Sequence, residues 1–237
     1  MSLSVIVFCG GQGSRIKPVL GSLPKILAPI ANKSFIDFLL PWISNSLGSV
    51  PHKIVLSTGI GHQAIHDYIQ KNLLTCSLSK EEKPLGTFGA LINVVQKVNI
   101  DDYVLLLNGD TIFDVDFSYV FNQFLLKPNV PLLLVKSSLE TGRYGGYSRL
   151  DNGKIKFCND NPEFISLGAF FCRKTDVMAC KDNSPVSPGK GLMLDTDFLD
   201  QSDIDVFVVS PEASFIDIGV PTDYQKAQQL IPSNFSL

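Results

Sequence analysis

Residues 5–15 read VIVFCGGQGSR, an apolar run followed at once by a loop with three glycines. The run is short enough to form a buried strand. Gly10, Gly11 and Gly13 carry no side chain, so the backbone N–H groups of this loop can approach a phosphate closely. We therefore expect a strand that ends in an anion-binding loop, with the fold organised around it.

The loop lies in a segment whose charges are all positive. Residues 1–36 contain no Asp or Glu, although the chain has a net charge of −3, and their cations are Arg15, Lys17, Lys25 and Lys33. This clustering creates a local positive field in which an anion can bind. The alternative is a plain glycine turn with Arg15 and Lys25 in solvent.

Two common nucleotide-binding motifs do not match the loop. No Gly-x-x-x-x-Gly-Lys-Ser/Thr string occurs in the chain, which excludes a Walker A loop. Counted from Gly11, the sixth position of a dinucleotide fingerprint is Ile16, where a glycine is required. The loop is therefore a phosphate-binding candidate of another type.

Length and composition limit the class of protein. The 237 residues, 45% of them hydrophobic and 18% charged, suffice for one sizeable core, and we expect a single domain over residues 1–237. The mild acidity argues against nucleic-acid binding, and no apolar run reaches the roughly 18–20 residues of a membrane span. Five scattered cysteines without a Cys-x-x-Cys pair indicate reduced thiols, and hence a cytoplasmic protein.

Hydrophobic periodicity predicts alternating strands and helices, followed by a β-rich part. Strands are expected at 5–9, 53–57, 76–78, 103–107 and 131–136, and helices at 34–47, 61–71, 88–97 and 116–126. The later expectations are strands at 144–150, 154–157, 165–172, 205–209 and 214–218, and helices at 192–200 and 221–230. The fold class is thus α/β, an open and mostly parallel Rossmann-like sheet with a smaller β-rich portion. Ligands of such sheets bind beyond the carboxyl ends of the strands, where both the glycine loop and Asn108-Gly109-Asp110 lie.

Asp110 ends a fully apolar strand and is a candidate ligand for a hard cation such as Mg²⁺, which prefers carboxylate and phosphate oxygens. Its alternative role is a helix cap after a tight turn. A partner carboxylate is expected from residues 191–225, which contain eight acids and no Lys, Arg or His. Asp217 is the best candidate because apolar residues and a glycine flank it.

Two further patterns are weaker candidates. Asp114 and Asp116 form the Asp-x-Asp pattern of glycosyltransferases that use sugar nucleotides, although the pair lies beyond the strand end. His62 and His66 are four residues apart on an expected helix and could bind a metal, but the glutamate of a zinc-protease helix is missing. A solvated helix face is the favoured interpretation of the histidines.

Several motifs together resemble one family over almost the whole chain. The chain is similar to the sugar-1-phosphate nucleotidylyltransferases, most of all to the D-glycero-D-manno-heptose 1-phosphate guanylyltransferase branch. The motifs that carry this resemblance are Cys9–Arg15, Leu23–Lys25, Ala28–Ile30, Pro84–Thr87, Asn108–Asp110, Arg143–Gly145 and Phe215–Pro221.

The resemblance implies a nucleotidyltransferase fold of the GT-A-like type and a reaction between a nucleoside triphosphate and a sugar 1-phosphate. Residues 1–136 would bind the nucleotide, and residues 137–237 the sugar phosphate. Arg15, Lys25 and Asp110 would be catalytic, and Asp110 and Asp217 would hold Mg²⁺. Gly10, Gly11, Gly13 and Gly86 would border the nucleotide. The resemblance leaves a homo-oligomer open.

Glu81 is the expected reader of the base, because it lies three residues before Pro84, where the family contacts the base edge. A carboxylate only accepts hydrogen bonds, and guanine offers a pair of neighbouring donors. Uracil and thymine offer one ring N–H between two carbonyls, so GTP is favoured over UTP and TTP, with CTP left open. Glu82 is an alternative reader, and either residue could be a charged loop tip.

The sugar half departs from the family pattern. The family's Phe-x-Glu-Lys string, whose lysine grips the sugar phosphate, corresponds here to Phe157–Asp160 and has lost the cation. Lys154, Lys156, Arg143 and Lys190 are candidates to replace it. The resemblance places sugar-phosphate contacts at Gly145, Asn159, Gly168 and Asp195. Because this half matches poorly, a thymidylyl-, uridylyl- or cytidylyltransferase and a catalytically degenerate nucleotide-binding member stay as alternatives.

Overall fold

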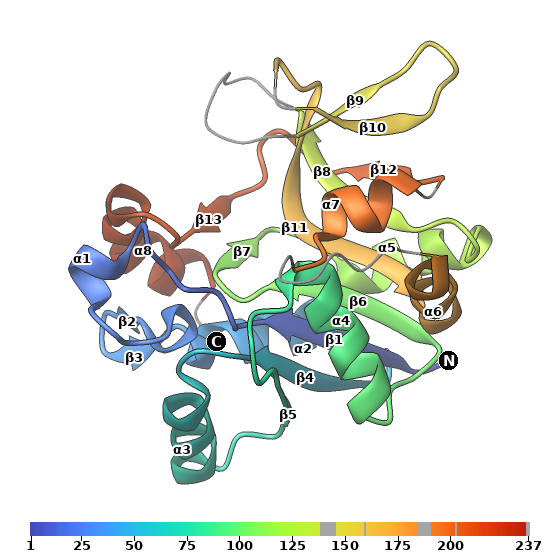
Figure 1. The fold of residues 1–237 in the computed structure, drawn as a ribbon. Coiled ribbons are helices and arrows are strands. Elements are labelled where there is room, and N and C mark those ends of the chain that lie inside the picture. The colour runs from blue at the N-terminus through green and yellow to red at the C-terminus, as the bar shows by residue number, and fades with distance from the viewer. Residues whose placement is uncertain (138–145, 159, 184–190, 202, 236–237) are drawn as a thin grey trace.

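The computed structural model describes residues 1–137, 146–158, 160–183, 191–201 and 203–235. Its centre is a mixed sheet that contains β1 (Leu3–Phe8), β4 (His52–Thr58), β5 (Ser77–Lys80) and β6 (Tyr103–Asn108). These four strands are parallel and lie in the order β6-β1-β4-β5. The glycine loop follows β1, and residues 109–110 follow β6, so both leave the same edge of the sheet (Figure 1).

The second half of the chain extends this sheet beyond β6. Strand β11 (Phe164–Arg173) pairs antiparallel with β6 and with β8 (Leu132–Ser137), and β12 (Asp205–Val208) pairs parallel with β8. The hairpin of β9 (Gly146–Arg149) and β10 (Ile155–Cys158) joins the amino-terminal end of β11 and stands away from the rest of the molecule (Figure 1). The expected α/β class is confirmed, with an antiparallel portion in the β-rich half.

Helices cover both faces of the sheet, which explains why the central strands are apolar without alternation. Val5 and Val7 of β1 face one core, and Ile6 faces the other, as period-2 geometry requires. Figure 1 shows α4 in front of the parallel strands and α2 behind them. The first core takes side chains from α2 (Ile36–Leu47), α3 (His62–Asn72), α5 (Phe117–Leu126) and α8 (Pro221–Asn234). The second takes them from α4 (Gly86–Lys97) and α6 (Lys174–Asn183).

Short elements complete the edge that carries the glycine loop. They are α1 (Lys17–Leu20), the 3₁₀ turn η1 (Lys25–Leu27), the hairpin β2 (Pro29–Ile30) and β3 (Lys33–Ser34), and a second two-stranded sheet formed by β7 (Thr111–Phe113) and β13 (Phe215–Asp217). The β7–β13 pair is antiparallel and joins segments that are about 100 residues apart in sequence. It fixes the carboxyl end of β6 against the last part of the chain.

Three local expectations differ from the structure. Helix α6 has no counterpart among the predicted elements. The helix expected at 192–200 is divided into α7 (Leu194–Asp197) and the 3₁₀ turn η2 (Leu199–Gln201). The helix expected at 34–47 begins only at Ile36, because Ser34 lies in β3, where its N–H donates to the Asp37 carboxylate. In the described part of the chain, no helix is long and apolar enough to cross a bilayer.

Candidate active site

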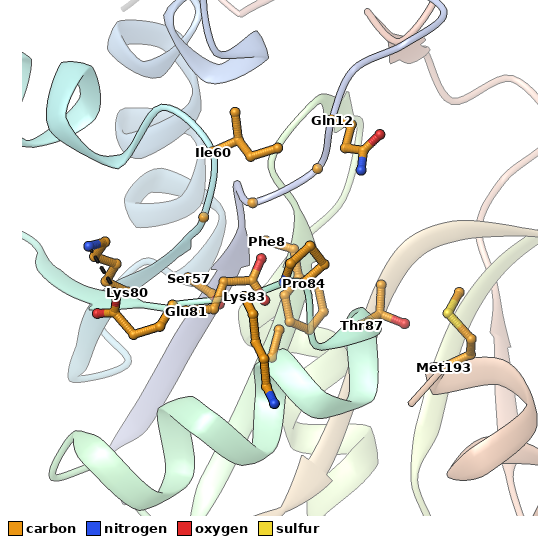
Figure 2. Close-up of a pocket in the computed structure, with 16 residues that line it drawn as sticks. Phe8, Gln12, Ser57, Ile60, Lys80, Glu81, Lys83, Pro84, Thr87 and Met193 are labelled. Atoms are coloured by element: carbon orange, nitrogen blue, oxygen red, sulfur yellow. Dashed lines mark hydrogen bonds and ion pairs between the residues drawn. The ribbon is translucent and has the colours of Figure 1, made fainter. Parts of the chain in front are cut away.

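The first cavity lies beside the glycine loop and has a volume of about 400 Å³. Its walls come mainly from three segments that the parallel strands bring together: residues 10–12 after β1, residues 57–60 at the end of β4, and residues 80–87 from the end of β5 to the start of α4. Met193 adds to the lining from the second half of the chain. Figure 2 shows Glu81, Lys83, Pro84 and Thr87 on one side of this cavity and Gln12 and Ile60 across from them. It is a ligand cavity beyond the carboxyl ends of the strands, where α/β sheets bind ligands.

Glu81 is held firmly inside this cavity. Its N–H donates to the Thr58 carbonyl at 2.8 Å, and its Oε2 accepts from the Leu85 N–H at 3.3 Å. Its Oε1 lies so close to two backbones that a Cβ at Gly10 would come within 2.6 Å of it, and one at Gly59 within 2.5 Å. Burial raises the pKa of Glu81, and the Leu85 N–H opposes this effect. By contrast, the exposed Glu82 forms an ion pair with Lys80 at 3.2 Å, so Glu81 is the acid of the two that the backbone holds in place.

The second cavity, of about 170 Å³, brings together Arg15, Asp110 and Asp217. The β7–β13 sheet makes this meeting possible, because Asp217 pairs in register with Thr111 and the Ile218 N–H donates to the Asp110 carbonyl at 2.9 Å. The two acids, 107 positions apart in the sequence, thus line one small space together with a guanidinium. Asp217 also accepts from the Gly219 N–H at 2.6 Å.

Lys25 neutralises Asp110 from the side of the glycine loop. Its Nζ lies 2.5 Å from Asp110 Oδ2, and both side chains are about one-fifth exposed. Gly13 adopts a φ of +60°, and the Lys25 stem passes 3.4 Å from the position of a Cβ there. A larger residue at 13 would be strained in this conformation and would crowd the stem.

Cys9, between β1 and the loop, is an inert neighbour of this pair. Its pKa is raised by burial and by the charge of Asp110, so the thiol stays protonated.

The two acids fit a magnesium ion. Mg²⁺ is commonly held by one or two carboxylates together with substrate phosphates and water. Among the described residues no group of three His, Cys, Asp or Glu side chains could hold a metal. Asp110 and Asp217 on one cavity beside Arg15 match the partial coordination that a phosphate completes.

The third cavity, of about 270 Å³, has walls of both apolar and polar side chains and one acidic side chain. Asp195 of α7 accepts a hydrogen bond from the hydroxyl of Tyr147 in β9. Burial and the Asp195 charge raise the pKa of Tyr147, so the phenol remains a donor. Helix α7 is tied to the first cavity, because the Leu194 N–H donates to Thr87 Oγ1 at 2.8 Å.

The three cavities are neighbours that share walls. Phe8 and Thr87 line both the first and the third, and Asn108 and Ser166 line both the second and the third. They meet at the carboxyl ends of β1 and β6. The arrangement can therefore hold a base, a group of phosphates and a third moiety side by side.

The structure places most of the expected site residues on these cavities. The first cavity is lined by Gly10, Gly11, Glu81 and Gly86, the second by Arg15, Asp110 and Asp217, and the third by Gly168 and Asp195. Lys25 adjoins the second cavity through its ion pair with Asp110, and Gly13 lies against the Lys25 stem. Gly145 and Asn159 lie outside the described residues, as do Arg143 and Lys190. Lys154 forms an exposed ion pair with Asp203, and Lys156 is exposed on β10, so neither replaces the missing cation.

The weaker candidates have structural partners. Asp116 caps α5 by accepting from the Tyr119 N–H at 2.8 Å, and Asp114 accepts from the Ser214 N–H at 2.8 Å. Both acids of the Asp-x-Asp pattern therefore accept hydrogen bonds from backbone N–H groups. His62 pairs with Thr58 Oγ1 at 2.8 Å, and His66 lies 3.3 Å from exposed Asp67, so the histidines do not form a metal pair.

Sequence reasoning missed Tyr147, Thr87 and Ser166 as cavity residues, and it used Asn108 only as part of a motif. Tyr147 and Ser166 come from strands in the β-rich half, where no pattern indicates which face turns toward the site. Thr87 and Asn108 adjoin predicted site residues in sequence, and this adjacency is the one signal that could have indicated them.

Fold and site together define an α/β protein that binds its ligands at the carboxyl ends of a mostly parallel sheet. The family model described as nucleotidyl transferase matches residues 4–233, and the chain belongs to this family. A D-glycero-alpha-D-manno-heptose 1-phosphate guanylyltransferase of Aneurinibacillus thermoaerophilus is 31% identical over 232 residues, which cover 96% of this chain and 97% of the relative. A protein of the same name from Campylobacter jejuni is 31% identical over 145 residues, covering 60% of this chain and 62% of the relative.

Solved structures agree with this assignment. The crystal structure of HddC from Yersinia pseudotuberculosis is 25% identical, has a TM-score of 0.77, and covers 96% of this chain and 98% of that chain. A putative glucose-1-phosphate thymidylyltransferase from Bacillus anthracis, at 18% identity and a TM-score of 0.78, covers 97% of this chain and 95% of that chain, and shows the shared fold alone.

Proposed function

We propose that the protein is a sugar-1-phosphate guanylyltransferase, which joins a heptose 1-phosphate or a similar sugar 1-phosphate to GTP. The observation that carries the proposal is the row of three cavities with shared walls. Glu81 lies in the first, Arg15 with two acids in the second, and the Tyr147–Asp195 pair in the third. The guanylyltransferase names of the relatives that match the chain support the same reaction.

The chemistry requires positioning and charge more than acid–base catalysis. A phosphate monoester has a second pKa near 6, so about neutral pH its oxygen is already a nucleophile. That oxygen attacks the α-phosphorus of GTP, the bond to the β-phosphate oxygen breaks, and pyrophosphate leaves with the electron pair. Arg15 and Lys25 hold the phosphates and stabilise the charge that develops on them. A magnesium ion held by Asp110 and Asp217 would supply further charge neutralisation.

We assign base specificity and sugar specificity to different parts of the chain. Glu81 would accept two hydrogen bonds from the N1–H and N2–H₂ groups of guanine. We assign residues 1–136 to the nucleotide and residues 137–237 to the sugar phosphate, within one domain. The third cavity would take the sugar ring, with Asp195 accepting from a sugar hydroxyl. Support for this division comes from the cavity walls, since the first cavity is lined by residues of the first half together with Met193, and most of the described residues that line the third belong to the second half.

We place the reaction in the cytoplasm. The five cysteines are thiols rather than disulfides, which is expected of a reducing compartment. A homo-oligomer stays a prediction, and light scattering of the purified protein would test it. No nucleic acid or membrane is proposed as a partner.

A pyrophosphate-release assay tests the proposed function. Four nucleoside triphosphates are crossed with heptose, mannose, glucose and N-acetylglucosamine 1-phosphates in the presence of Mg²⁺. We expect release with GTP and one or two of the sugars. Release of pyrophosphate with UTP or TTP in place of GTP would contradict the proposed guanine specificity. No release with any pair would contradict the proposed nucleotidyl-transfer reaction.

A further inference from the structure

Asn108 lies between the second cavity, which is proposed for the phosphates (the phosphate cavity), and the third cavity, which is proposed for the sugar (the sugar cavity). It is the last residue of β6 and is exposed, whereas the four residues before it are buried. Its side chain lines both cavities. Within the described part of the chain its amide forms no hydrogen bond to the protein, so both the donor and the acceptor of the amide are open to a ligand.

A bulge in the neighbouring strand makes room for this side chain. The pairing of β11 with β8 shifts between Ser166 and Ala169. Ala169 pairs with Leu107 of β6, so Gly168 lies beside Asn108. Gly168 has a φ of +69°, and a Cβ there would overlap the Asn108 amide. Its N–H donates to Ser166 Oγ at 3.1 Å, which holds the bulge in place. Bulges of this kind commonly aim side chains next to active sites.

We propose that Asn108 is a specificity-determining residue that binds the sugar 1-phosphate at the junction of its phosphate and its ring. On one side of the amide lie Arg15 and the two acids, and on the other the third cavity with Asp195. A neutral group that both donates and accepts suits this place, because it can donate to a phosphate or linking oxygen and accept from the adjacent ring hydroxyl. Gly168 acts through Asn108 as a positioning residue. The inference rests on the proposed function.

The first test replaces the amide by a carboxylate of the same shape. Asn108→Asp loses the donor and adds a charge that repels the phosphate. We expect its dissociation constants for heptose 1-phosphate and mannose 1-phosphate, measured by calorimetry, to rise about 10-fold or more. Its dissociation constant for GTP should change less than about 2-fold, because Asn108 does not line the first cavity. Asn108→Ala should weaken sugar phosphate binding in the same direction, and the melting temperature of each variant reports its folding.

The second test moves Asn108 without changing it. Gly168→Ala should weaken sugar phosphate binding as Asn108→Ala does, and in the Asn108→Ala background it should add little. Gly153→Ala is the matched control: Gly153 has a φ of +81° in the β9–β10 turn, and nothing lies within 4 Å of a Cβ there. It carries the same backbone strain without touching the amide, so its binding constants should equal those of the wild type.

The outcomes distinguish a failure of the proposed function from a failure of the role assigned to Asn108. If the wild-type protein binds neither sugar phosphate, the proposed function fails and this inference fails with it. If the wild type binds and Asn108→Asp binds equally well, the role of Asn108 is overturned while the transferase stands. Equal losses of sugar phosphate and GTP binding would indicate a structural role and would also overturn it.

Discussion

The Lys25–Asp110 ion pair is the central contact of the site at the scale of single residues. The half-buried carboxylate is one of two that line the phosphate cavity. As long as Lys25 Nζ lies 2.5 Å from Oδ2, that oxygen is shared with the lysine rather than offered to a metal. Triphosphate oxygens would compete for the lysine, and this links nucleotide binding to metal binding.

Replacing Asp110 by Asn should lower kcat about 100- to 1000-fold, because the variant loses one of the two carboxylate charges that would hold a magnesium ion beside the reacting phosphates. Pyrophosphate release measures the rate, and the melting temperature checks the fold. Asp116→Asn is the matched control, since Asn caps a helix as well as Asp does and Asp116 only caps α5. A near-normal rate for Asp110→Asn would refute the metal assignment.

Removing the lysine should expose Asp110 to divalent ions. We expect Lys25→Met to bind Mn²⁺ about 10-fold more tightly than the wild type without nucleotide, a change of about 1.4 kcal/mol. Electron paramagnetic resonance of free Mn²⁺ provides the measurement. Lys17→Met removes the same charge from an exposed position on α1 and should have little effect. Equal affinities in both variants would mean that the ion pair does not restrict metal access.

The raised pKa of Glu81 predicts that kcat/KM for GTP depends on pH. Burial raises the pKa of this carboxyl above its ordinary value of 4.5, and only the ionised form accepts both guanine donors. As the pH falls, kcat/KM for GTP should therefore begin to drop at a pH above the ordinary glutamate range, since this ratio reports the free enzyme. Glu81→Gln should remove the contribution of Glu81 to this drop, leaving that of the substrate phosphate with its second pKa of about 6, and should shift preference toward UTP or TTP. An unchanged base preference would exclude Glu81 as the reader.

At the scale of elements, the β7–β13 pair decides whether the site forms. It carries Asp217 to Asp110 and is supported from behind by α2, where Trp42 Nε1 donates to the Phe113 carbonyl at 3.0 Å. The Trp42 ring also meets the Phe113 and Phe117 rings edge-on, with centroids 5.4 and 5.2 Å away. A buried helix thus fixes the strand that the metal site needs.

Trp42→Phe should lower the free energy of unfolding by about 1–3 kcal/mol, because it keeps an aromatic ring but leaves the Phe113 carbonyl without its donor. Urea unfolding followed by circular dichroism gives the value, since Trp42 is the single tryptophan of the chain. Tyr119→Phe, on an exposed ring, should stay within about 0.5 kcal/mol of the wild type. Equal stabilities of the two variants would exclude a stabilising role for the hydrogen bond from Trp42 to the Phe113 carbonyl.

At the scale of the whole molecule, both halves of the chain build the site around one shared sheet. Ligands that bind the folded protein and not the unfolded chain raise its stability by mass action. GTP with Mg²⁺ at about 100 times its dissociation constant should add about 2.7 kcal/mol, which for a chain of this length is about 5–10 °C in melting temperature. Scanning calorimetry should show a smaller shift with UTP at the same concentration. Equal shifts for both nucleotides would contradict guanine selectivity.

The first half of the fold was largely predictable, whereas the second half was less so. Runs such as residues 103–107 are apolar throughout, and only a strand covered on both faces explains them. Helix α6 has a mixed face, with few apolar positions at helical spacing, and no periodicity marks it. The late start of α7 at Leu194 goes with contacts from another part of the chain, since Leu85 and Thr87 accept hydrogen bonds from the N–H groups of Leu192 and Leu194.

The sequence by itself determined the glycine loop, the parallel core and the choice of charged candidate site residues. These depend on local features: glycine spacing, apolar period, and the absence of acids from residues 1–36. Only the tertiary structure decided which side chains meet. It paired Asp217 with Asp110 through β7 and β13, and it set Asn108 against Gly168 through a bulge. The physical reason is that register and backbone conformation between distant segments are set by packing and long-range hydrogen bonds, which no local pattern encodes.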